Sequence, residues 1–262
     1  MNLGLEGKIA LVGGSSRGLG RAVAEELAAE GASLVLCARS PEPLARAGSE
    51  IEQRFGVPVL AVPADLSVPG EPTRVAGEAL ARFGAIDVLV ANTGGPPAGS
   101  FETLELADWD GAVALLIRSV VELTAAVLPS MKSRGWGRIL AVSSIAARQP
   151  VDNLMLSNTL RPAVTGFANA LAREVARDGI TVNTILPGFT NTERIATLAR
   201  ADTARGLDPA AQQERTRAEI PLGRLAEPHE FSALAAFLVS ERAAYITGSA
   251  FAVDGGWIRG LF

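Results

Sequence analysis

A glycine-rich stretch near the N-terminus restricts the folds open to this chain more than any other feature. Residues 13–20 read GGSSRGLG; they follow an apolar run at 9–12 and precede a helix-like run at 21–27. Glycines let a turn close tightly and let a phosphate approach the backbone. The free N–H groups at the start of the following helix then attract the anion. A strand, a glycine turn and a helix in this order predict a site for a nucleotide pyrophosphate.

Seven apolar runs, the first of which leads into the glycine turn, are continuous rather than alternating. This is typical of parallel strands buried on both faces. They lie at residues 8–13, 33–38, 57–62, 86–91, 137–143, 180–186 and 249–253. Alanine-rich amphipathic stretches separate most of them, so we expect an α/β fold: a single Rossmann-type doubly wound parallel sheet of about seven strands with helices on both faces. Without a linker or repeat, we expect one dinucleotide-binding domain over residues 1–262.

The regular spacing breaks once, at residues 192–240, which contain no strand candidate. Insertions beyond the carboxyl edge of such a sheet commonly form lids or binding loops. We expect residues 189–220 to form a substrate lid. With residues 94–101 and 145–156, this lid would line the substrate pocket.

Composition excludes several classes of protein. The net charge of −4 argues against a nucleic-acid-binding surface. The single cysteine, Cys37, excludes an internal disulfide, and with one histidine, His229, a zinc site is not expected. We find no uninterrupted run of about 18 apolar residues and no basic, apolar leader, so neither a membrane span nor a signal peptide is expected. We therefore expect a cytoplasmic protein without a metal ion.

Further motifs follow the ends of other predicted strands and lie near the C-terminus. They are Asp65-Leu66, Asn92-Thr93-Gly94, Pro187-Gly188 with Thr192, Tyr245-Ile246-Thr247-Gly248 and Val253-Asp254-Gly255-Gly256. Together with the G-x-x-x-G-x-G spacing of the glycine turn, they make the chain resemble the short-chain dehydrogenase/reductase family over nearly its whole length.

The resemblance implies an oxidoreductase that binds a nicotinamide dinucleotide. The cofactor-binding residues that it implies are Gly14, Ser16, Arg17, Gly18, Leu19, Gly20, Arg39, Ser40, Asp65, Leu66, Asn92, Gly94, Pro187, Gly188 and Thr192. Two of them have other interpretations: Asp65 could be purely structural, and Asn92 is expected to shape the turn between strand and cofactor.

The end of the second predicted strand indicates which dinucleotide is preferred. An acidic residue there would bind the ribose 2′-hydroxyl of NAD, but the sequence continues Ala38-Arg39-Ser40. Arg17 and Arg39 could bracket a 2′-phosphate instead. We expect NADP(H) rather than NAD(H); the alternative is that Arg39 only caps a solvated loop.

The catalytic residues of the family are mostly missing. Ser144 occupies the position of its catalytic serine, but Ser157 and Arg161 stand where its tyrosine and lysine are found. The only tyrosine of the chain, Tyr245, belongs to the C-terminal motif, and Leu116 replaces the catalytic asparagine. We take Ser144, Ser157 and Arg161 as the candidate catalytic residues.

These replacements change the chemistry. A serine hydroxyl is far less acidic than a phenol, and loss of a positioned general acid costs about 10²–10⁴-fold in rate. Arg161 keeps a permanent positive charge that could support the nicotinamide ribose or a developing oxyanion. Pro162 predicts a kink or a late helix start beside it. Ser144 has a structural alternative as the cap of a loop.

Two functions stay open. The first is an NADP(H)-dependent oxidoreductase acting on a carbonyl or alcohol, with a 3-oxoacyl thioester as one candidate and with an atypical or impaired catalytic site. The second is a nucleotide-binding protein without hydride chemistry, such as a sensor or assembly partner. The family resemblance implies a homotetramer or dimer, and we expect the apolar tail to form a subunit interface. The tail residues are Trp257, Ile258, Leu261 and Phe262.

Overall fold

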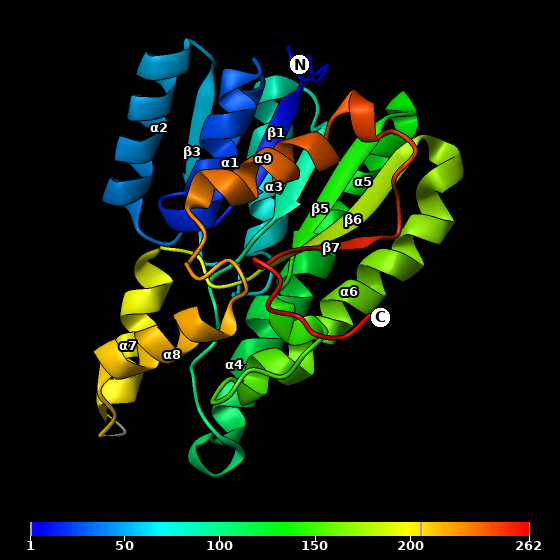
Figure 1. The fold of residues 1–262 in the computed structure, drawn as a ribbon. Coiled ribbons are helices and arrows are strands. Elements are labelled where there is room, and N and C mark those ends of the chain that lie inside the picture. Colours follow the sequence, from blue (N-terminus) through cyan, green and yellow to red (C-terminus); the bar gives the residue numbers. More distant parts are fainter. Residues whose placement is uncertain (1, 205, 262) are drawn as a thin grey trace.

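Parallel strands form one sheet in the order β3-β2-β1-β4-β5-β6-β7. The computed structural model describes residues 2–204 and 206–261, and within them the sheet has seven strands. They are β1 (Ile9–Gly13), β2 (Ser33–Ala38), β3 (Val59–Pro63), β4 (Val88–Ala91), β5 (Gly137–Val142), β6 (Ile180–Pro187) and β7 (Ala250–Val253). The strand order reverses between β1 and β4, as in the predicted doubly wound fold, which is confirmed (Figure 1).

Two strands begin two residues later than predicted, for identifiable reasons. Pro58 has no N–H to donate to a ladder, so β3 begins at Val59. Asp87 precedes β4 and uses its carboxylate to accept the Ile9 N–H at 2.8 Å, so the ladder with β1 begins one residue later, at Val88.

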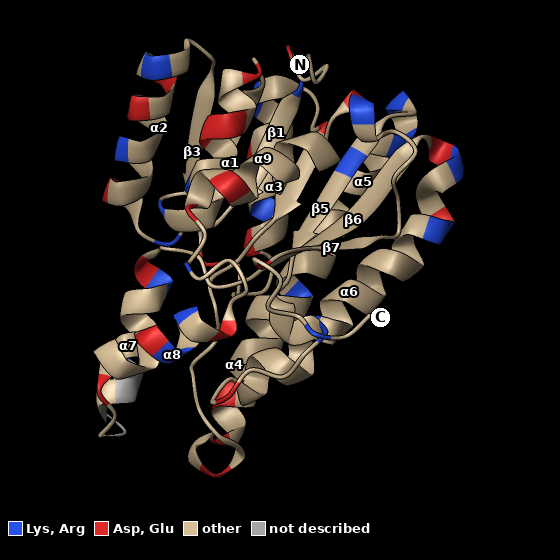
Figure 2. Ribbon diagram, viewed as in Figure 1, with Lys and Arg blue, Asp and Glu red and all other residues tan. Residues whose placement is uncertain are grey.

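Helices cover both faces of the sheet (Figure 1). One face carries α1 (Gly18–Ala29), α2 (Pro41–Phe55) and α9 (Pro228–Leu238), and the other carries α3 (Glu71–Phe83), α5 (Ser119–Arg134) and α6 (Met155–Val175). Neighbouring strand residues such as Leu11 and Val12 belong to the cores on opposite faces, and both are fully buried. This explains why the strand sequences are apolar without alternation. Charges lie mainly on the helices and are nearly absent from the strands (Figure 2).

A long helix runs through α4 (Leu106–Val113), a π-helical turn (Ala114–Arg118) and α5. This 29-residue helix is long and apolar enough to cross a membrane, with a mean hydropathy of 1.9 in its most apolar window. The sequence search for uninterrupted apolar residues missed it because Arg118 and Glu122 lie within the window. One side of the helix is buried against the sheet, through Leu123 among others.

The strand-free segment is helical. It contains α7 (Glu193–Ala204) and α8 (Pro209–Glu219), which lie beyond the carboxyl ends of the strands (Figure 1). At the base of this segment, the Asn191 N–H donates to the Ala226 carbonyl at 2.8 Å, and Thr190 and Ala226 form a parallel bridge.

The C-terminal tail is only partly exposed in the single chain. Trp257 is buried against Ile220 and meets Phe189 edge-to-face, with ring centroids 5.7 Å apart. Its indole N–H donates to Glu219 at the end of α8 at 3.2 Å. The C-terminal tail therefore packs against the lid residues of the same chain. Leu261 is exposed, and Phe262 lies outside the described residues.

Candidate dinucleotide and substrate site

The glycine turn between β1 and α1 requires its glycines. Gly14 and Gly18 have φ angles of +59° and +58°, which disfavour a side chain. A Cβ on Gly14 would lie 2.7 Å from Asn92 Nδ2, and one on Gly20 would lie 2.3 Å from the Gly14 carbonyl oxygen. A side chain is therefore excluded by close contacts at Gly14 and Gly20, and it is disfavoured by the backbone conformation at Gly14 and Gly18.

Residues from two neighbouring strands hold the turn in place. Asn92, at the end of β4, donates from Nδ2 to the Gly13 carbonyl at 3.0 Å. Buried Ser15 accepts the Cys37 N–H at Oγ at 2.9 Å, and its own N–H donates to the Cys37 carbonyl at 3.1 Å. Leu66 packs against the turn beside Gly13. Asn92 therefore shapes the turn, as expected, and Ser15 is an anchor that the sequence analysis did not identify.

The start of α1 has no side-chain cap. Arg17 precedes the helix without capping it by a side-chain hydrogen bond, and the first turn contains no acidic residue. The N–H groups of this turn therefore lack side-chain acceptors of the usual capping kind. Ser16 and Leu19 lie half-buried in the same turn.

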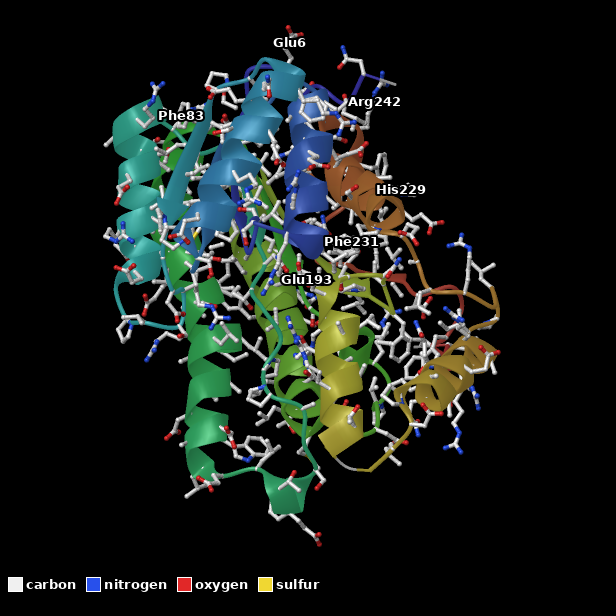
Figure 3. All side chains as sticks on the ribbon, turned by 90° about the vertical axis from the view of Figure 1, so that its left-hand side faces the viewer. Glu6, Phe83, Glu193, His229, Phe231 and Arg242 are labelled. Carbon is white, nitrogen blue, oxygen red and sulfur yellow. The ribbon has the colours of Figure 1, made fainter. Side chains whose placement is uncertain are left out.

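The loop after β6 reaches this turn. Thr192 lies 3.7 Å from the position of a Cβ on Gly18, and Arg17 forms an ion pair with Glu193. Glu193 begins α7 just beyond the N-terminal end of α1 (Figure 3). Gly188 lies against the backbone of Asp254: a Cβ added to Gly188 would lie 2.7 Å from the Cα of Asp254. With Pro187 at the end of β6, this segment closes over the carboxyl edge of the sheet.

The end of β2 carries a positive charge and no carboxylate. Arg39 and Ser40 are both exposed there. Burial on its own raises the pKa of nearby Asp65, but hydrogen bonds from Ser67 and the charge of Arg39 outweigh it and lower that pKa.

Burial raises the pKa of the Cys37 thiol to about 12, as expected for a small apolar core residue. Gly94 is exposed after β4.

Ser157 and Arg161 lie one turn apart on the buried side of α6. The helix begins at Met155 and continues through Pro162, so the predicted late helix start is wrong. Both side chains lie on the same helix face because they are four residues apart in a continuous helix, and both precede Pro162, which removes only one backbone hydrogen bond. The Ser157 hydroxyl makes no hydrogen bond with the described residues.

The two serines after β5 have different partners. Ser143 is buried, and its hydroxyl donates to the Arg161 carbonyl at 3.0 Å. Ser144 precedes a short 3₁₀ helix and accepts the Ala146 N–H at Oγ at 3.1 Å. The structural alternative for Ser144, a loop cap, is therefore present, and its hydroxyl keeps its proton for a further hydrogen bond.

Arg161 and Arg194 are close enough to influence each other electrostatically. Burial lowers the pKa of Arg161 to about 10, and the charge of Arg194 contributes to this. Arg194 lies over Gly95 and donates to the Pro96 carbonyl at 2.9 Å. The sequence analysis missed Arg194, because only the fold brings α7 to the loop after β4.

Other candidates play no part in this site. Leu116 is buried in the π-helical turn, Tyr245 is fully exposed, and His229 is exposed at the start of α9. Within residues 2–204 and 206–261, no three acidic, histidine or cysteine side chains gather as a metal site.

The comparisons with known proteins agree with this geometry. The profile of a family described as Enoyl-(Acyl carrier protein) reductase matches residues 14–258. Oxidoreductase UcpA of Escherichia coli O157:H7 is 36% identical, with 96% of this chain and 95% of that protein covered. The 3-oxoacyl-[acyl-carrier-protein] reductase FabG of Aquifex aeolicus is 31% identical, with 98% and 99% covered. The chain belongs to the short-chain dehydrogenase/reductase family.

A solved member of the short-chain dehydrogenase/reductase family has nearly the same fold. The crystal structure of L-sorbose reductase from Gluconobacter frateurii, complexed with NADPH and L-sorbose, superposes with a TM-score of 0.94 at 36% identity and covers 100% of both chains. The family resemblance seen in the sequence is thereby confirmed. The replacement of tyrosine and lysine by Ser157 and Arg161 remains a feature of this chain's own sequence.

Proposed function

We propose that the protein is an NADP(H)-dependent oxidoreductase that acts on a carbonyl or alcohol. The observation that carries this proposal is the turn at Gly14–Gly20, which presents the uncapped start of α1 at the point where the strand order reverses. Pyrophosphates bind at such a point because N–H groups and the helix dipole converge there. The cofactor residues predicted from the sequence remain part of this proposal.

The proposal favours NADP(H), with its additional 2′-phosphate, over NAD(H). Arg39 stands where an NAD-binding family member would have a carboxylate, and the related L-sorbose reductase holds NADPH. When bound, the nicotinamide would give or accept a hydride. Arg17 and Arg39 would supply positive charge for the adenosine phosphate, and Asn92 would keep the turn in its binding shape.

The catalytic part of the proposal relies on three side chains. Ser144 would donate its hydroxyl hydrogen to the substrate oxygen, because its lone pair already caps the following 3₁₀ helix. Ser157 would be a second polar contact that passes a proton from water. Arg161 would stabilise negative charge near the reacting carbon without giving up its proton. We expect slower turnover than in a family member with tyrosine at position 157.

Cofactor binding and turnover are tested separately. NADPH and NADH are titrated against intrinsic tryptophan fluorescence, and absorbance at the reduced nicotinamide band is then followed with ketones, 3-oxoacyl thioesters and quinones. We expect at least tenfold tighter binding of NADPH, and we expect Arg39→Asp to remove this preference while Arg54→Asp keeps it. Failure of both dinucleotides to bind at millimolar concentration contradicts the proposal.

The absence of tyrosine at position 157 favours a second candidate function, a nucleotide-binding protein without hydride chemistry. It shares the same cofactor site. Tight NADPH binding together with no oxidation by any member of the substrate panel would support this alternative against the enzyme.

We further propose a cytoplasmic homotetramer or dimer. A small apolar groove lies between the long helix and α6 and is lined by Leu116, Ile117, Val120, Val121, Val164 and Phe167. Val121 is exposed, whereas Leu116, Val120 and Val164 are buried. Exposed Val113 extends this apolar surface along the same long helix. Pairing of two copies there would bury it. Light scattering at micromolar concentration checks the assembly, and a monomer would contradict it.

A further inference from the structure

The fold leaves the guanidinium of Arg161 only partly satisfied. This side chain is 7% exposed, and Nη1 donates to the Val142 carbonyl at 2.8 Å. Nε is buried and has no hydrogen-bond partner. Nη2 has no partner either but is not among the buried atoms, so it reaches open space. Among the described residues, no carboxylate forms an ion pair with Arg161, although a buried cation is normally paired.

Arg194 brings a second cation to the same place. Its guanidinium is held over the loop after β4, where a Cβ on Gly95 would come within 2.7 Å of Cζ. One nitrogen donates to the Pro96 carbonyl, and burial lowers the pKa of this arginine too. Within the part of the chain that the structure describes, Arg194 also has no carboxylate partner.

Two cations close together in a partly buried site repel each other. The influence of Arg194 on the pKa of Arg161 reflects this repulsion. Several exposed arginines pair with acids, as Arg224 does with Glu230. Buried Arg138 also lacks a carboxylate, but it donates to the carbonyls of Gly137, Gly179 and Ser240. Arg161 instead leaves Nε without a partner, so a bound anion would supply the missing negative charge.

The position of the two arginines indicates which anion this is. Arg161 is one helical turn from Ser157, at the reacting end of the site, whereas the pyrophosphate turn lies at the start of α1. We propose that Arg161 and Arg194 bind a carboxylate of the substrate, so that the protein acts on oxo acids or hydroxy acids. This inference rests on the proposed oxidoreductase function. The alternative anion for the same two arginines is the pyrophosphate of the cofactor.

Matched acids and ketones test the proposal. The probes are 2-oxobutanoate, 3-oxobutanoate and 4-oxopentanoate, each compared with the methyl ketone of equal chain length. Calorimetry gives their dissociation constants with the cofactor-free and the NADP⁺-loaded protein, and kcat/KM is measured with NADPH. We expect at least one acid to bind tenfold or more tightly than its ketone, with the preference reduced by added salt.

Variants test whether Arg161 and Arg194 cause the preference for acids. Arg194→Gln should reduce the preference for the acid about tenfold and Arg194→Lys less, while Arg200→Gln, on the exposed side of the same helix, should change it less than twofold. Arg161→Lys keeps the charge at the second position and should keep part of the preference. Circular dichroism checks that each variant is folded.

The outcomes separate the two proposals. Equal binding of acids and ketones to a protein that binds NADPH overturns the carboxylate site alone. If Arg194→Gln weakens NADPH binding tenfold but leaves the acid preference unchanged, Arg194 serves the pyrophosphate and the carboxylate site is wrong. Acid-selective binding by a protein that binds neither dinucleotide would keep the anion site and overturn the oxidoreductase.

Discussion

Arg17 in the glycine turn and Glu193 at the start of α7 form an ion pair, although they are 176 residues apart in the sequence. The pair joins the proposed pyrophosphate site to the lid. It also places the Glu193 carboxylate beside Arg17, which is one of the proposed cofactor-binding residues. A bound dinucleotide would compete with Glu193 for Arg17, so the lid and the cofactor are linked through this contact.

We expect Glu193→Gln to tighten NADPH binding about two- to tenfold, because it removes a negative charge beside the anion site and frees Arg17. The effect should shrink at high salt, since both side chains are largely exposed. Fluorescence titration gives the dissociation constants. Glu174→Gln, at an exposed position near the far end of α6, is the matched control and should bind NADPH as the wild type does. Weaker binding by the Glu193 variant would contradict the competition.

Gly14→Ala should abolish dinucleotide binding and lower the free energy of unfolding by about 1–3 kcal/mol, because a left-handed residue gains a side chain that meets Asn92. Gly77→Ala is the control. Gly77 lies exposed within α3 with nothing near its Cβ position, so alanine should stabilise the protein by about 0.5–1 kcal/mol. Urea denaturation and NADPH titration measure both effects. Normal NADPH binding by the Gly14 variant would contradict the site.

Restoring the family residues tests the catalytic replacements. Because α6 runs unbroken from Met155 through Pro162, a tyrosine at 157 and a lysine at 161 would face the same pocket. We expect Ser157→Tyr with Arg161→Lys to raise the rate of reduction of neutral ketones by about 10²-fold or more, since it supplies a general acid.

Ser157→Phe with Arg161→Lys has the same bulk and charge but no phenol, and it should show no such gain. Equal ketone reduction by the two double variants would show that the hydroxyl is not the missing element. A loss of NADPH binding in both would show instead that position 157 has no room for a ring.

The Arg224–Glu230 pair predicts a pH dependence of stability. Its hydrogen bonds, and one from the Glu227 N–H, lower the pKa of Glu230 from an ordinary 4.5 to about 2. A lowered carboxyl pKa stabilises the folded state above the unfolded pKa, and this contribution is lost as the pH falls from about 4.5 towards 2. Arg224→Gln should therefore melt at a lower temperature than the wild type at pH 6, with the difference vanishing near pH 2. A difference that is constant over this range would contradict the assignment.

The sequence predicted the sheet well because its strands are buried on both faces, and the resulting apolar runs need no tertiary information. The glycine turn was identified from the same pattern, because it directly follows the first apolar run. The errors lay where single side chains decide the outcome: Pro58 delays β3, and Asp87 uses its carboxylate before β4 begins.

The site was predicted less completely. Gly14, Asn92 and Thr192 were identified from motifs, and the structure brings them together. Arg194 could not be found in the same way, because its neighbours Gly95 and Pro96 are distant in sequence and belong to another loop. The helical form of the lid was also hidden, since α8 is polar on most sides and its contact with the distant C-terminal tail, through Trp257 and Glu219, cannot be read from the sequence.

The bridge between Thr190 and Ala226 closes the base of the excursion that contains α7 and α8. Residues of this excursion that contact neither the glycine turn nor the C-terminal tail can therefore change in length or sequence while β6 and β7 keep their register. Natural variation confined to those residues would alter which compounds are accepted without disturbing folding. Grafting the excursion between related proteins is accordingly a direct route to new chemical selectivity on the same scaffold.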